Sequence, residues 1–223
     1  MFETNAGSCD LSTIDIDTVG GVIHGTNLRA LPIPGHYPCA PAWSPFGDTI
    51  AFGGAQPGGI SGIYLISAGG GQVVTLYSTA APIATMWSAW RSSGDAVAFV
   101  EDSSSKSAIK VLNRGTGLVT TVLDFGEFGF APIRTLSWAR TRDVLAFGAY
   151  RRGKWETDTI PLARDGAGNF VRAAAPVHVF NQIGATWSPD DSHLAFDGVY
   201  VLDLATGRSQ KLGSGGSSPN WRR

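Results

Sequence analysis

A tryptophan-centred repeat constrains the fold of this chain more than any other feature of its sequence. Five tryptophans recur at spacings of 47, 48, 49 and 34 residues: Trp43, Trp90, Trp138, Trp187 and Trp221. Seven residues after each of the first four, an aliphatic residue begins the triplet [ILV]-A-F, which ends at Phe52, Phe99, Phe147 and Phe196. Periods of this length are typical of β-propeller blades. The pattern W-x6-[ILV]-A-F therefore predicts four copies of one structural unit.

Each repeat has the pattern of a four-stranded blade. The tryptophan ends a short strand, residues with turn chemistry follow, and the [ILV]-A-F triplet opens the returning strand. Third strands are predicted at 62–66, 108–112, 157–162 and 199–202. Fourth strands are predicted at 72–77, 118–123 and 209–212, with a less regular one within 169–179. Helical periodicity is almost absent, which favours an all-β fold.

Three local features refine this prediction. Side chains alternate across a strand, so the Ala and the Phe of each triplet face opposite sides of the blade, one against each neighbouring blade. Asp197 and Gly198 are predicted to form a two-residue turn, which explains the shortened last spacing. Pro161 is expected at a strand position where its missing N–H group is tolerated.

Two remnants flank the four repeats and complement each other. Residues 218–223 have the pattern of a first strand, and 2–5, 11–17 and 22–31 have those of a second, third and fourth strand. Together they predict a fifth blade, in which the C-terminal strand joins the N-terminal three-stranded piece and leaves no unpaired inner edge. We therefore expect a single domain, 1–223, that forms a five-bladed propeller of four-stranded antiparallel blades, the complete ones spanning about 40–78, 87–124, 135–179 and 184–213. The competing interpretation is a fragment of a six- to eight-bladed protein.

Charge and hydropathy exclude several classes of partner. Seventeen basic and eighteen acidic residues give a net charge of −1, so no global field attracts nucleic acid or an anionic membrane surface. No stretch approaches the roughly 20 apolar residues of a membrane helix. The first ten residues lack the pattern of a signal peptide, so we expect either a cytoplasmic protein or one whose leader has been removed.

Two of the repeats resemble the W-S-P-D motif of TolB-type propeller repeats, which are WD40-like and also occur in relatives of prolyl oligopeptidase. The resemblance lies in Ala42-Trp43-Ser44-Pro45 and in Thr186-Trp187-Ser188-Pro189-Asp190; the second and third repeats depart from it at Arg91 and Ala139. The resemblance implies a non-catalytic interaction platform, periplasmic or extracellular, with a protein partner. We expect a monomer.

Candidate catalytic and metal-binding residues have simpler structural explanations. Asp48, Asp95, Asp143 and Asp191 recur in the hairpin turns, where carboxylates cap backbone N–H groups. The four histidines are scattered without a metal-binding spacing, and no G-x-S-x-G elbow is present. No catalytic residue, metal ion or cofactor is therefore predicted. Two alternatives stay open: a glycosidase or lyase with carboxylates in the central funnel, and a purely structural propeller.

A binding surface is predicted on one face of the disc. Residues 150–156 hold three cations and two aromatic rings, and the inter-blade loop 124–130 holds three phenylalanines. Both segments lie on the same face in propeller topology, and their composition is that of interface hot spots. The predicted contact residues are Arg151, Arg152, Trp155, Phe128 and Phe130, with Tyr37 and Trp87 as neighbours. The alternative is that the phenylalanines fill space between blades and the cations are solvated.

Cys9 and Cys39 are predicted to form a disulfide if the protein is exported. Each precedes a strand that begins on the same face of the disc, so the two thiols lie at the same height on adjacent blades. Closing a loop of about 30 residues stabilises a protein by roughly 3 kcal/mol on the chain-entropy model. The alternative is a pair of buried thiols in a cytosolic protein.

Overall fold

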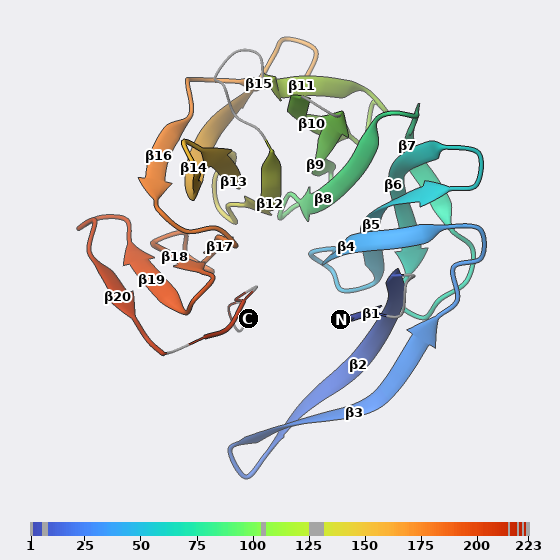
Figure 1. The fold of residues 1–223 in the computed structure, drawn as a ribbon, viewed down its shortest axis with the longest axis horizontal. Coiled ribbons are helices and arrows are strands. Elements are labelled where there is room, and N and C mark those ends of the chain that lie inside the picture. Colours follow the sequence, from blue (N-terminus) through green and yellow to red (C-terminus); the bar gives the residue numbers. More distant parts are fainter. Residues whose placement is uncertain are drawn as a thin grey trace. The chain divides into compact units, whose positions relative to one another are not determined.

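All regular elements in the described part of the chain are β-strands. The structure, a computed structural model, describes residues 2–5, 9–103, 106–124, 132–213, 215–217, 219 and 221. These residues form five antiparallel sheets (Figure 1). The first is the three-stranded N-terminal sheet of β1 (Phe2–Asn5), β2 (Cys9–Val19) and β3 (Val22–Leu31).

The remaining sheets coincide with the four predicted repeats. The first repeat forms β4 (Tyr37–Trp43), β5 (Thr49–Gln56), β6 (Ile60–Ser67) and β7 (Val74–Ala80). The second forms β8 (Ala84–Trp90), β9 (Ala96–Ser103), β10 (Lys106–Asn113) and β11 (Val119–Asp124). The third forms β12 (Ile133–Trp138), β13 (Val144–Arg151), β14 (Lys154–Arg164), β15 (Phe170–Arg172) and β16 (Val177–Phe180). The fourth forms β17 (Thr186–Trp187), β18 (His193–Phe196), β19 (Tyr200–Asp203) and β20 (Ser209–Lys211).

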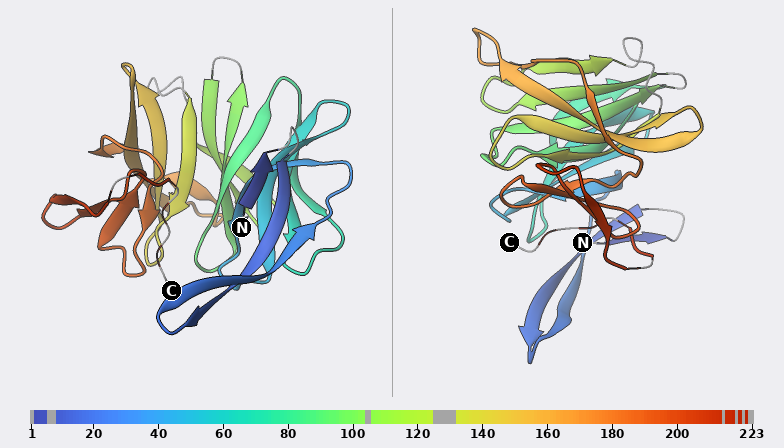
Figure 2. Two further views of the ribbon diagram at one scale, coloured as in Figure 1. Left: turned by 60° about the horizontal axis from the view of Figure 1, so that its bottom comes forward. Right: turned by 90° about the vertical axis from the view of Figure 1, so that its left-hand side faces the viewer.

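Two compact units make up the chain, Met1–Trp87 and Ser88–Arg223. In the first unit, Leu11 and Leu31 of the N-terminal sheet pack with apolar side chains of the β4–β7 sheet: Ile50, Phe52, Tyr64 and Ile66. The N-terminal sheet therefore packs as a neighbouring blade would. Beyond this contact, the β2–β3 hairpin extends away from the β4–β7 sheet (Figures 1 and 2).

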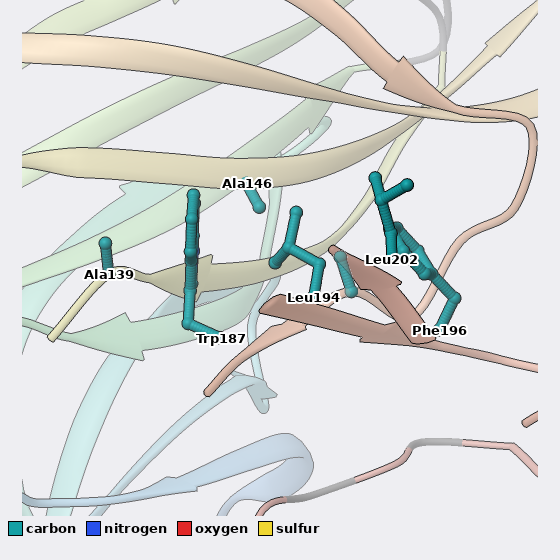
Figure 3. Packing of buried hydrophobic residues seen from close by; sticks show 7 residues of the cluster. Ala139, Ala146, Trp187, Leu194, Phe196 and Leu202 are labelled. Atoms are coloured by element: carbon teal, nitrogen blue, oxygen red, sulfur yellow. The ribbon is translucent and has the colours of Figure 1, made fainter. Parts of the chain in front are cut away.

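The Ala-Phe pairs pack as their alternation predicts. All four phenylalanines are fully buried, and their alanine neighbours are also buried. In the second unit, Ala146 of the third blade contributes to one cluster with Trp187 and Phe196 of the fourth (Figure 3). A small side chain on one blade thus meets large ones on the next, which lets adjacent sheets approach closely.

Two of the repeated tryptophans, Trp187 and Trp221, connect successive blades through their indole N–H groups, whereas the buried indole nitrogen of Trp138 has no hydrogen-bond partner among the described residues. Trp187 Nε1 donates to the carbonyl of Ser137, 3.1 Å away on the first strand of the preceding blade. Trp221 Nε1 donates in the same way to the carbonyl of Thr186, at 2.9 Å. Trp221 therefore sits on the fourth blade as Trp187 sits on the third. Pro219 and Trp221 lie outside any strand, so the predicted closing strand 218–223 stays a prediction.

A left-handed residue occurs three positions before each of the first four repeat tryptophans. These residues are Ala40, Trp87, Thr135 and Gly184, with φ values of 47°, 57°, 50° and 76°. In β4 and β12 they coincide with a shift in strand register, which identifies a β-bulge in the first strand of the blade.

The structure corrects two local predictions. The fourth strand expected within 169–179 is divided into β15 and β16, which pair with different halves of β14. Pro161 lies between the part of β14 that pairs with β15 and the part that pairs with β16, and its carbonyl accepts from Ala173 N. The missing N–H of proline is tolerated there, because neither β15 nor β16 requires a donor at this position. The predicted two-residue turn has three residues instead, since Val199 joins Asp197 and Gly198 with a φ of 60°.

Candidate functional site

The β13–β14 hairpin displays an aromatic pair beside its turn. Arg152 and Gly153 form the two-residue turn, with φ values of 49° and 82°, as a type I′ hairpin requires. This turn places Tyr150 opposite Trp155, and their rings meet edge to face with centroids 5.3 Å apart. Tyr150 is 40% exposed and Trp155 is half-buried, so the pair forms part of the protein surface.

Arg151 is held against the blade by two carboxylates. Its Nη2 donates to both oxygens of Asp158, each 2.7 Å away, and its Nε lies 3.0 Å from Glu156 Oε2. Asp158 is fully buried, and this burial raises the pKa of its carboxyl, with the positive charge of Arg151 acting in the opposite direction. The guanidinium thereby compensates a buried negative charge. Its role in partner contact stays a prediction.

Arg152 and Lys154 differ from Arg151 in their surroundings. Both are exposed, and within the described ranges neither forms an ion pair. The acidic groups nearest in sequence, Glu156 and Asp158, are engaged by Arg151. The end of the hairpin therefore carries local positive charge on a chain whose net charge is −1.

His178 of β16 completes a cluster that the sequence analysis missed. It pairs with Asp158 across the β14–β16 ladder, and its Nδ1 lies 3.3 Å from Asp158 Oδ1 and 3.9 Å from Glu156 Oε2. One ligand atom from each of these three residues lies within 4.8 Å of the other two, close enough to hold a metal ion. Glu156 and Asp158 lie two residues apart on the same face of β14. The sequence does not predict which residue of the divided fourth strand pairs with them.

The other predicted contact residues are spread over the chain. Tyr37 is 56% exposed at the start of β4, and Trp87 is half-buried with its indole nitrogen lacking a hydrogen-bond partner among the described residues; both belong to the first compact unit. Phe128 and Phe130 lie outside the described residues. So does the side chain of Cys9, while Cys39 is half-buried; their disulfide stays a prediction.

The recurring turn carboxylates have structural roles. Asp191 of the fourth blade accepts hydrogen bonds from the backbone N–H groups of Arg140 and Thr141 in the turn of the third blade. Asp143 of the third blade accepts from the guanidinium of Arg91 in the second. These two carboxylates therefore connect the turns of adjacent blades, which supports a structural role for them.

Comparison with known proteins shows which solved structures have a similar fold. No protein-family model matches the chain, and no curated protein matches it. Among solved structures, TolB from Acinetobacter baumannii is similar over 92% of this chain, with a TM-score of 0.67 and 16% identity. The chain has a TolB-like β-propeller fold. It spans about half the length of that TolB, 49%.

Two further structures share the TolB-like fold. A putative TolB from Agrobacterium tumefaciens matches 87% of this chain and 73% of its own, with a TM-score of 0.66 and 15% identity. A chain of the nidogen/laminin complex matches 87% of this chain and 72% of its own, with a TM-score of 0.61 and 16% identity. In the part of the chain described, no helix is long and apolar enough to cross a membrane.

Proposed function

We propose that this protein is a non-catalytic binding module of TolB-like type that engages a protein partner. The proposed contact is the hairpin-tip surface, defined as Tyr150, Arg152, Lys154 and Trp155. The observation that supports it most is an exposed aromatic pair flanked by two cations that have no ion pair among the described residues. Aromatic and cationic side chains of this kind dominate the binding energy of protein interfaces.

The electrostatics of the hairpin-tip surface suggest the chemistry of the partner. Because Arg151 is compensated by Glu156 and Asp158, Arg152 and Lys154 set the local charge. We propose an acidic protein segment with an apolar or aromatic group that packs on Tyr150 and Trp155. We further propose that the module is a monomer, without nucleic-acid binding or membrane insertion, that works in the periplasm or outside the cell.

Site-specific photo-crosslinking tests this proposal. A photoreactive phenylalanine analogue at Tyr150 is compared with the same analogue at Leu118, which is 53% exposed near β11. We expect a discrete crosslinked protein from position 150, absent from position 118 and lost when Arg152 and Lys154 are both changed to Glu. Equal crosslinking from both positions, or none from position 150, would contradict the proposed surface.

The enzymatic alternative, a glycosidase or lyase, requires carboxylates with a catalytic role. It requires two acidic groups able to exchange protons with a substrate. Glu156 and Asp158 are adjacent, but both are bound to Arg151, which favours a structural role for them. A purely structural propeller is the second alternative, and it predicts no crosslinked partner from any surface position.

A further inference from the structure

Glu156, Asp158 and His178 bring three potential metal-ligand atoms within 4.8 Å of one another. His178 Nδ1 and one oxygen of each carboxylate face one another. All three atoms are hydrogen-bond acceptors unless Nδ1 carries a proton. The Nδ1–H tautomer of His178 donates to Asp158 in the absence of a metal ion, and a bound metal ion would take the place of that proton among the three atoms.

The distances within the cluster fit a small transition-metal ion. Zinc binds nitrogen and carboxylate oxygen at about 2.0–2.2 Å, which sets neighbouring ligands of a tetrahedral site about 3.3–3.5 Å apart. Nδ1 of His178 lies 3.3 Å from Asp158 Oδ1 and 3.9 Å from Glu156 Oε2. The first of these distances matches the tetrahedral spacing, and the second exceeds it by about half an ångström.

The local charge also favours a cation. Two carboxylates share the single guanidinium of Arg151, and the Asp158 side chain is only 1% exposed. Arg151 already occupies one side of these carboxylates, so it acts as an internal competitor for an added cation. His178 is 45% exposed, which gives an ion from solvent a path to the cluster.

From this geometry we propose that Glu156, Asp158 and His178 form a binding site for a divalent transition-metal ion, with zinc as the ion to test. An imidazole ligand selects Zn²⁺ over Ca²⁺ and Mg²⁺, and the usual order of affinities places Zn²⁺ above Mn²⁺. The ion would connect β14 to β16, which otherwise pair over only Thr157, Asp158 and Thr159. A bound ion would therefore hold β16, the second part of the divided fourth strand of the third blade, against β14.

Titration calorimetry with ZnCl2 on the full chain tests the site. We expect one saturable site, weakened at least about tenfold in His178→Gln, which removes an exposed ligand without burying a new group. His24→Gln, which changes another exposed histidine, is the matched control for adventitious binding and should bind as the unmodified protein does. Arg151→Gln should bind more tightly, because it removes the competing cation.

A thermal melt supplies a second readout. Zn²⁺ should raise the Tm of the unmodified protein more than that of His178→Gln, because a ligand that binds only the folded state stabilises it by an amount that grows with the ratio of free ligand to Kd. The proposal is overturned if the unmodified protein binds no Zn²⁺, if His178→Gln binds equally well, or if binding is lost in His24→Gln. These outcomes are independent of the hairpin-tip surface, since no residue of that surface is changed.

Discussion

At the scale of single residues, buried carboxylates connect the blades of the second unit. Asp191 shows this most clearly: it is 5% exposed and accepts from Arg140 N at 2.7 Å and from Thr141 N at 2.8 Å. Its neighbour Asp190 is exposed and bonds only within its own turn, to Ser188 and Ser192. Asp191 therefore stabilises the contact between two blades, whereas Asp190 stabilises its own turn.

Asp191→Ala should lower the free energy of unfolding by about 3 kcal/mol, because it leaves two backbone N–H groups of the neighbouring turn without an acceptor. Chemical denaturation followed by tryptophan fluorescence measures the change. Asp190→Ala is the matched control, and a smaller loss is expected there. A larger effect for Asp190→Ala than for Asp191→Ala would show that the inter-blade bonds contribute little.

Asp203 provides a pH-dependent prediction. Hydrogen bonds from the backbone of Thr206 and Ala205 lower the pKa of its carboxyl below the ordinary 3.8. A lowered folded-state pKa stabilises above the unfolded pKa, and this contribution is lost as the pH falls through the folded value. Asp203→Asn keeps an acceptor but removes the charge. Its Tm should lie below that of the unmodified protein at neutral pH, and the difference should close below about pH 4; a difference independent of pH would contradict this.

At the scale of elements, the first strand of a blade approaches the backbone of a neighbouring strand so closely that only glycine fits there. Gly53 of β5 lies against β8: a Cβ there would stand 2.5 Å from the carbonyl oxygen of Thr85 and 2.7 Å from the Cα of Met86. The left-handed Trp87 follows directly. Glycine is therefore required at position 53 by close backbone approach and not by its own φ angle.

Gly53→Ala should destabilise the protein by about 2 kcal/mol, because backbone atoms of β8 must move to admit the methyl group. Gly69→Ala is the control: its Cβ would meet only Ser67 Oγ, at 3.9 Å, and it should change stability by less than about 0.5 kcal/mol. Equilibrium unfolding in urea compares the two. Equal effects at both positions would refute the close approach.

At the scale of the whole molecule, the indole hydrogen bonds of Trp187 and Trp221 support the predicted fifth blade. Trp221 sits on the fourth blade as Trp187 sits on the third, and Trp43 is 36% exposed at the end of β4. We propose that Trp221 belongs to the first strand of a fifth blade whose other strands are β1, β2 and β3. Closure would give the Trp43 indole a backbone carbonyl beside Trp221, as Trp187 and Trp221 each have one on the blade before them.

Trp221→Ala should then weaken two distant regions at once. We expect a loss of about 2 kcal/mol, since the side chain is half-buried. Hydrogen–deuterium exchange should quicken in β17, where the indole bonds, and also in β1, where the closing strand would pair. Faster exchange confined to β17 would refute closure and favour a fragment of a larger propeller.

The sequence by itself determined the number and register of the four complete blades. Burial is encoded locally: a tryptophan and an Ala-Phe pair at fixed spacing define which face of each strand is apolar, and Phe52, Phe99, Phe147 and Phe196 are all buried accordingly. The N-terminal strands were also predictable, since alternation and turns are properties of adjacent residues. The hairpin-tip surface follows from the same local pattern, because Arg152 and Gly153 fix the turn that pairs Tyr150 with Trp155.

Only the tertiary structure decided what lies across strands and between blades. The left-handed residues Ala40, Trp87 and Thr135 share no residue type, so residue preference does not mark these positions in the sequence. The partners of Glu156 and Asp158 depended on how β15 and β16 divide the edge of β14, and hydrophobic pattern does not encode that division. The pairing of His178 with Asp158 thus arises from strand register, a contact between segments that are 20 residues apart in the chain.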